Sequence, residues 1–221
     1  MGQFQKDYLD LILVPCGLFL MFGYHLILVY RYVNCPENTT IGYENHNKRA
    51  WVKKNVSEVE LKERGPAISV ISSNISAATA LSSISLVLCS IIGAWIGSSN
   101  TNIFTNNYIY GNKSPSTVYI KYISMLSCFL VAFACFVQTA RYFVHVNFLI
   151  SMPNNDIPVN CVVKEVIRGS NFWLIGLRSL YFATNLLLWI FGPIPMFICS
   201  VIMVGVLLNF DWNTTPLHQY K

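Results

Sequence analysis

The clearest shortage in this sequence is charge. Asp, Glu, Lys and Arg make up 11% of the 221 residues, against about 25% in an ordinary soluble domain. None of these four residue types occurs between Gly65 and Asn112. A soluble domain needs charged side chains over its surface, so such a stretch excludes that class of protein. Hydrophobic residues account for 54% of the chain, and lipid is therefore the expected solvent for much of it.

The sequence also lacks the patterns of metal and catalytic sites. It has seven cysteines but no C-x-x-C pair, and no His and Cys spacing suits zinc. Neither a nucleophile with its base and acid nor a phosphate-binding loop is found. We therefore expect no metal, no cofactor, no nucleic-acid partner and no enzymatic activity.

Four apolar segments are long enough to cross a bilayer, which takes about 20 residues of helix. They cover residues 8–32, 66–97, 118–150 and 172–210. In hydrocarbon only helices or a closed barrel satisfy every backbone group, and four strands cannot close a barrel. The sequence therefore predicts an all-α fold, a single membrane domain over 1–221 with four transmembrane helices in a bundle. The first segment is interpreted as a retained helix because its apolar core exceeds that of a secretory signal.

The fourth segment contains a helix-breaking run. Gly192 is followed by Pro193 and Pro195. Each proline removes a backbone donor and disfavours a straight helix. We expect the fourth helix to be kinked at Gly192–Pro195.

The basic residues predict an orientation. Ten Lys and Arg residues lie in or beside the loops 33–65 and 151–171, whereas Lys6, Lys113, Lys121 and Lys221 lie on the opposite side. Cytosolic loops carry the excess of Lys and Arg. This pattern predicts two cytosolic loops and two extracytosolic termini. The glycosylation sequons at Asn112 and Asn213 would then be on the translocated side, with Pro115 and Pro216 close behind them.

The first cytosolic loop has helical character between residues 44 and 65. Its apolar residues form a strip beneath a basic flank, and Trp with Lys near lipid headgroups is an anchoring combination. We expect a short interfacial helix, or alternatively a solvated connector. The candidate lipid-surface residues are Lys48, Arg49, Trp51, Lys53 and Lys54.

The second segment repeats small residues at helical spacing, at Ser69, Ser73, Ser76, Ala80 and Ser83. Small residues let helix backbones approach closely, and serines can bond across helices. The pattern indicates a face that packs against another helix; a hydrated lining is the alternative.

Polar residues recur near the cytosolic end of all four segments. Gln138, Arg141 and His145 are three and four positions apart and so share a helix face, as do Arg178, Tyr181 and Asn185. The predicted ligand-binding candidates are His25, Arg31, Asn74, Gln138, Arg141, His145, Arg178, Tyr181 and Asn185. If these faces turn inward they form one cluster.

The predicted cluster carries a net positive charge. No Asp or Glu lies inside the four apolar cores, the first of which runs from Leu11 to Tyr30. An Arg at the bilayer centre costs about 2.5–3.5 kcal/mol on insertion scales, so a missing counter-charge matters. Two interpretations remain open: the cluster binds a small anion or a lipid phosphate, or the cationic side chains only reach to the interface.

Several pieces of the chain resemble one known family. They are "YHLILVYRYV", "PENTTIGYENHNKRAWV", "RYFVHVNFLISMP" and "GLRSLYFATNLLLWIFGPIPMF", in that order from Tyr24 to Met196. The set is similar to a plant and bacterial multi-pass membrane family known as domain of unknown function 599. Where the family often has a basic residue before the Asn of the second helix, this chain has Ser73 before Asn74. The resemblance implies an integral membrane protein and no particular reaction.

Three functions therefore remain. The favoured one is a non-enzymatic membrane component that binds anionic lipid or a partner through a basic cytosolic face. The first alternative is an oligomeric anion channel or transporter. Its partners would be copies of the same chain, because four helices make a narrow bundle. The second alternative, a membrane-embedded enzyme, has the weakest basis because no catalytic set is found.

Overall fold

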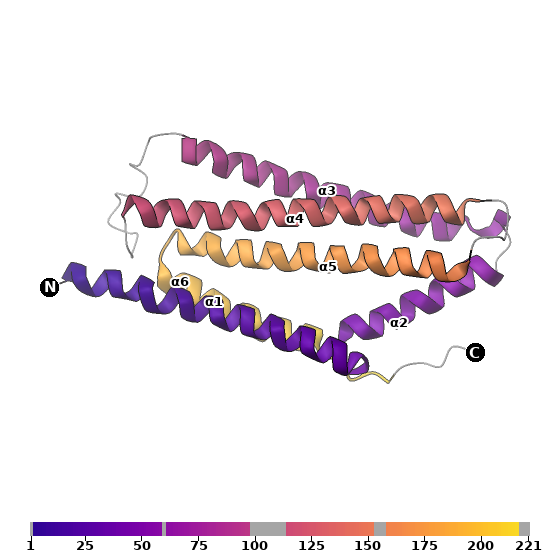
Figure 1. Ribbon diagram of the computed structural model, residues 1–221, viewed down its shortest axis with the longest axis horizontal. Coiled ribbons are helices and arrows are strands. Elements are labelled where there is room, and N and C mark those ends of the chain that lie inside the picture. Colours follow the sequence, from indigo (N-terminus) through magenta and orange to yellow (C-terminus); the bar gives the residue numbers. More distant parts are fainter. Residues whose placement is uncertain (1, 59–60, 98–113, 153–157, 217–221) are drawn as a thin grey trace.

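The protein is built from long helices that run side by side (Figure 1). The computed structural model describes residues 2–58, 61–97, 114–152 and 158–216. Five helices of this part are long and apolar enough to cross a membrane, which is typical of a multi-pass integral membrane protein. They are α1 (Gly2–Asn34), α3 (Gly65–Gly97), α4 (Pro115–Ile150), α5 (Val159–Trp189) and α6 (Pro193–Asp211). The predicted all-α fold is confirmed over the described residues.

The helices form two groups. Helices α3, α4 and α5 lie next to one another in alternating direction, with α4 between the other two, and α1 and α6 lie together beside α5 (Figure 1). Helix α2 (Thr40–Lys53) crosses obliquely at one end of the bundle. We call this the α2 end, and we call the opposite end, where α5 turns into α6, the hairpin end.

The predicted fourth span is two helices rather than one kinked helix. Helix α5 begins at Val159 and ends at Trp189, and α6 begins at Pro193. Between them Gly192 has a φ of 142°, a conformation that favours glycine. Pro193 then begins α6, where its missing N–H costs nothing. The chain therefore reverses, and the predicted count of four spans is not confirmed.

The extra reversal brings the end of α6 back to the α2 end. Thr39 and Trp212 form an isolated antiparallel bridge, and the backbone N–H of Asn213 donates to Asn38 O at 3.2 Å. Helix α1 starts at the hairpin end (Figure 1). The expectation that both termini lie on one side is therefore unsupported.

The predicted helix of the first loop exists, but it starts earlier, at Thr40, and ends at Lys53. Thr39 caps it by accepting from Gly42 N at 3.2 Å. A Cβ on Gly42 would lie 2.1 Å from Pro36 O, so only glycine fits where the 3-10 helix η1 (Pro36–Asn38) approaches. The apolar residue Val52 is fully buried, which shows that this part of the strip faces the bundle.

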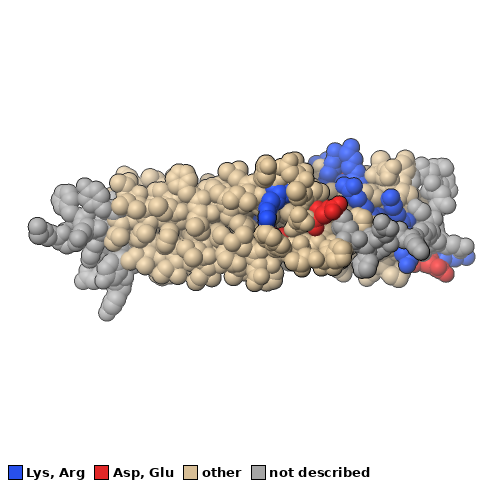
Figure 2. Space-filling model, turned by 90° about the horizontal axis from the view of Figure 1, so that it is seen from below, with Lys and Arg blue, Asp and Glu red and all other residues tan. Residues whose placement is uncertain are grey.

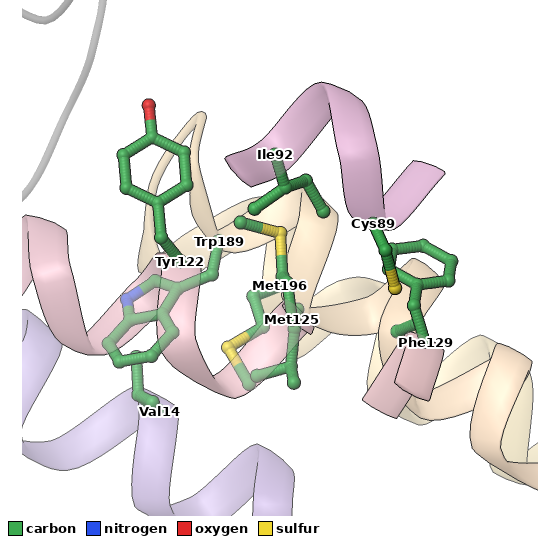
Figure 3. Close-up of a cluster of buried hydrophobic side chains, with 10 residues drawn as sticks. Val14, Cys89, Ile92, Tyr122, Met125, Phe129, Trp189 and Met196 are labelled. Atoms are coloured by element: carbon green, nitrogen blue, oxygen red, sulfur yellow. The ribbon is translucent and has the colours of Figure 1, made fainter. Parts of the chain in front are cut away.

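Two clusters of buried side chains form most of the core. At the α2 end, Val52 and Val56 pack with apolar side chains of α3, α4 and α5. Toward the hairpin end, a second cluster draws on all five long helices, including Val14 of α1 and Met196 of α6 (Figure 3). The loop after α1 is therefore part of the same domain as the helices.

Helices α4 and α5 approach closely because glycines face aromatic rings. A Cβ on Gly176 would lie 2.8 Å from a ring carbon of Phe136, and one on Gly169 would lie 3.3 Å from the ring of Phe143. The buried Thr139 hydroxyl donates to Cys135 O at 2.9 Å and lies 3.3 Å from Gly169 O. Backbone proximity thus fixes the position of α5 against α4.

The five small residues of α3 that were predicted to form a packing face do not pack within the described chain. Ser69, Ser73, Ser76, Ala80 and Ser83 are all exposed on the outer side of α3. Two of the hydroxyls bond back to their own helix, Ser76 to Ser72 O at 3.1 Å and Ser83 to Thr79 O at 3.0 Å. The predicted packing face is therefore not one that this bundle uses.

Replacing Gly176 with valine tests the close approach of α4 and α5. The new side chain would meet the Phe136 ring, and overpacking a core costs about 1–3 kcal/mol. We expect Gly176→Val to lower the midpoint of unfolding in a denaturing-detergent titration. Gly205→Val is the matched control, because no atom lies within 4 Å of a Cβ built there. Equal losses in both variants would contradict the proposed contact.

Candidate functional site

One face of α5 makes three polar contacts with α1 and α6. Arg178, Asn185 and Trp189 are seven and four positions apart, so they lie on one side of the helix. This side meets α1 and α6. Polar residues inside membrane helices are costly, so each needs a partner. The partners lie at three depths.

At the α2 end, α1, α5 and α6 meet at a single carboxylate. The Arg178 guanidinium donates to Asp211 Oδ1 at 2.5 Å, and the Tyr24 hydroxyl donates to Asp211 Oδ2. The side chains of the ion pair are only 15% and 11% exposed. Asp211 therefore ties the last turn of α6 to both other helices.

His25 lies next to this network. Its Nδ1 is 2.7 Å from Met21 O, and because a carbonyl only accepts, Nδ1 carries the proton. The ring packs against Tyr24 and Phe182, with centroid distances of 5.2 and 5.1 Å. The other ring nitrogen, Nε2, is buried and has no hydrogen-bond partner among the described residues, and the same is true of one guanidinium nitrogen of Arg178. Beside the Asp211 carboxylate, His25 Nε2 thus remains an unused acceptor and one Arg178 nitrogen an unused donor.

In the middle of the bundle, Asn185 pairs with Ser200 of α6. The Asn185 amide donates to Ser200 Oγ at 2.7 Å, and the hydroxyl donates to Met196 O at 3.0 Å. Both side chains are fully buried. A Cβ on Gly17 of α1 would lie 2.8 Å from Ser200 Oγ, so α1 passes directly over this pair.

At the hairpin end, a second acidic residue is buried. Trp189 Nε1 donates to Asp10 Oδ1 at 2.8 Å, and Lys121 Nζ lies 5.1 Å from the centre of the Trp189 ring. Asp10 and Lys121 are only 8% and 6% exposed. Trp189 belongs to the cluster drawn in Figure 3, so this polar contact is enclosed by apolar side chains.

The structure divides the predicted cationic cluster. His25, Arg178 and Tyr181 lie near one another, with the Arg178 guanidinium 5.9 Å from the Tyr181 ring centre, and Asn185 lies deeper on the same face. Arg141 and His145 are exposed on the outer side of α4, where Arg141 contacts Gln138 at 3.5 Å. Asn74 is exposed on α3, and Arg31 stacks on Trp212 at the end of α1.

The expectation that no carboxylate balances Arg178 is wrong. Its partner Asp211 lies one position beyond the predicted end of the fourth segment. A single continuous helix would also have carried that residue to the far side of the membrane. Only the reversal at Gly192 returns Asp211 to the depth of Arg178.

Lys and Arg side chains gather at the α2 end. On the face that Figure 2 shows, they cover the end where α2 lies, and the surface toward the hairpin end carries none over a long distance. Arg49, Lys53 and Lys54 are exposed, Lys48 pairs with Glu44 at 2.9 Å, and Trp51 is half-buried against the cluster around Val52. Arg64 differs, because it is buried and donates to Val56 O at 2.8 Å.

Among the described residues, no three His, Cys, Asp or Glu side chains come together in a group able to hold a metal ion. The polar contacts of α5 instead have the chemistry of helix-to-helix bonds: one ion pair, one amide–hydroxyl pair and one indole–carboxylate pair. Their common physical effect is to orient α1 and α6 against α5.

The Arg178–Asp211 pair is expected to contribute to stability as a unit. Removing one member of a buried ion pair costs about 3–5 kcal/mol, whereas replacing both by apolar residues is often neutral. We expect Arg178→Met and Asp211→Leu each to lower the unfolding midpoint strongly, and the double variant to lose far less than the sum. The exposed pair Glu165 and Arg168 is the control, because such pairs contribute about 0–1 kcal/mol. Additive losses at Arg178 and Asp211 would count against a direct pair.

The comparisons with known proteins identify the family of this chain and nothing finer. No curated protein and no solved structure matches the chain. One family, described as "Protein of unknown function, DUF599", matches residues 12–216. That range includes all three polar contact regions except Asp10. Because the match covers nearly the whole chain, this protein belongs to the DUF599 family.

Proposed function

We propose that this protein is a non-enzymatic integral membrane component whose basic end faces the cytosol and binds anionic lipid. The observation that carries the proposal is the unequal distribution of Lys and Arg between the two ends of the bundle. Such an asymmetry both orients a membrane protein and attracts anionic headgroups.

The orientation follows from the helix ends. The α2 end carries the loop lysines and arginines together with Arg31, Lys164 and Arg168, whereas Lys6 and Lys121 lie toward the hairpin end. The positive-inside rule then places the α2 end in the cytosol. With five spans, the start of α1 is extracytosolic and the end of α6 is cytosolic.

The lipid-binding surface is formed by Arg49, Lys53 and Lys54. All three are exposed, and no carboxylate among the described residues lies within ion-pair distance of them. Attraction of a basic side chain to an anionic leaflet contributes about 1 kcal/mol. Lys48 contributes less because Glu44 already pairs with it.

Anion conduction through one copy has less support. Arg178 is balanced by Asp211, and Arg141 and His145 lie on the outer side of α4. An anion path would therefore have to form between copies of the chain. Tight contacts along α5 favour a packed interface rather than a conduit.

Neutralising the exposed basic side chains tests the lipid proposal. In nanodiscs of mixed phosphatidylserine and phosphatidylcholine, the wild-type protein should retain phosphatidylserine preferentially, as counted by native mass spectrometry. The variant Arg49→Gln/Lys53→Gln/Lys54→Gln should lose this preference, and so should the wild type at high salt, which screens charges. The control Lys6→Gln/Lys113→Gln, which removes two positive charges from outside this surface, should keep it. An unchanged preference in the triple variant would refute the proposal.

The orientation has a separate test. An epitope tag before Met1 should be accessible from outside sealed cells, and a tag after Lys221 only after permeabilisation. Asn213 should carry no glycan, because the cytosolic side lacks the transferase, and its amide already donates to Glu37 O at 3.0 Å. A glycan lost on Asn213→Gln, or two tags on one side, would show that the orientation is wrong.

A further inference from the structure

A small open pocket lies at the α2 end, between the last turns of α1 and α6. Its membrane-facing wall is apolar and consists of Ile27, Leu28 and Leu208. Ile27 and Leu208 are 61% and 48% exposed, so the wall continues onto the lipid-facing surface. The other side of the pocket is formed by Arg31, Thr39 and Trp212. The pocket is thus apolar toward the membrane core and cationic toward its end.

The Arg31 side chain is held in place by stacking on Trp212 rather than by a hydrogen-bond acceptor of the described chain. Its guanidinium carbon lies 4.0 Å from the centre of the Trp212 ring, a stacking arrangement that Arg favours over Lys. Within the described part of the chain, its side chain makes no ion pair and no hydrogen bond. The planar N–H donors are therefore oriented and unused.

The remaining charges of the pocket cancel. Asp211 and Tyr24 also line it, but one oxygen of Asp211 accepts from Arg178 and the other from Tyr24. The carboxylate is consequently already balanced, and one positive charge, that of Arg31, remains. A ligand that fits this pocket carries one negative charge on oxygen atoms and an apolar part that lies toward the membrane core.

We propose that the pocket binds a membrane phospholipid, with a phosphate oxygen on Arg31 and an acyl chain against Ile27 and Leu208. Guanidinium groups match phosphate oxygens in geometry. The pocket has a volume of about 20 Å³, room for a group about the size of one water molecule, so a single phosphate oxygen enters and the rest of the lipid lies outside. Trp212 is placed as an interfacial aromatic residue would be.

This inference deepens the proposed lipid binding and rests on the α2 end lying at a membrane surface, but it concerns a different set of residues. The surface formed by Arg49, Lys53 and Lys54 selects for net negative headgroups. The Arg31 pocket binds the phosphodiester group, which zwitterionic lipids also carry. The two proposals can therefore be refuted independently of each other.

The test uses the full chain purified with phosphatidylcholine as the only phospholipid. After detergent washing, native mass spectrometry counts the lipid retained per protein. We expect one retained lipid in the wild type and about tenfold less occupancy in Arg31→Gln, as for loss of a charged hydrogen bond. Trp212→Leu keeps the charge but removes the stacking, and it should also lower occupancy.

The control is Arg168→Gln, which removes the same charge from a side chain already paired with Glu165 at 3.2 Å. It should retain the lipid, and all variants should keep the unfolding midpoint of the wild type. Excess inorganic phosphate should not displace the lipid. Equal retention in Arg31→Gln and wild type would overturn the proposal, and so would displacement by inorganic phosphate, which would make the ligand a free anion. Loss of the lipid in Arg49→Gln/Lys53→Gln/Lys54→Gln together with full retention in Arg31→Gln would also refute the pocket.

Discussion

The arrangement of α1, α5 and α6 depends on the carboxylate of Asp211. It accepts from Arg178 of α5 at 2.5 Å and from Tyr24 of α1, and so joins three helices at one point. In lipid the hydrophobic effect does not drive helices together, and polar bonds and close contacts do so instead. A mostly buried ion pair also fixes the relative position of its two helices, because separating the charges would leave each one buried without a partner. The C-terminal helix is thus held where it can satisfy Arg178.

The same physical logic recurs along α5 at two further depths. Asn185 bonds to Ser200 beneath Gly17, and Trp189 bonds to Asp10 near Lys121. Each contact joins a polar group of α5 to α1 or α6, and each lies among apolar side chains. The contact between α4 and α5 is of a different kind, because glycines of α5 there face aromatic rings of α4. The bundle therefore has a polar interface on one side of α5 and a close-packed one on the other.

The positions of the two proposed lipid-binding surfaces follow from this arrangement of helices. Because Asp211 balances Arg178, the cationic groups that we assign to lipid binding are side chains at the α2 end that have no ion pair among the described residues: Arg49, Lys53, Lys54 and Arg31. The return of α6 also places Trp212 beneath the guanidinium of Arg31. The pocket that we assign to a phospholipid thus exists only because the hairpin brings α6 back. The same helix that removes an internal anion site creates a candidate site at the membrane boundary.

Much of this protein could be predicted from its sequence, because hydropathy is a property of composition. The lack of charge between Gly65 and Asn112 sufficed for the membrane class, and the length of the apolar runs sufficed for helices. The break at Gly192–Pro195 was visible as well, but a kink and a reversal have the same local signature. They differ in whether the following helix finds partners on the returning path.

The sequence by itself therefore determined that the chain is helical and apolar enough for a membrane, which family it belongs to, and that Lys and Arg accumulate in its loops. Only the tertiary structure decided the number of long apolar helices, the end of the bundle at which α6 finishes, and the partner of Arg178. The reason is that these depend on contacts between residues far apart in the chain, such as Tyr24 and Asp211. No local pattern of residues encodes which distant carboxylate will balance a buried cation.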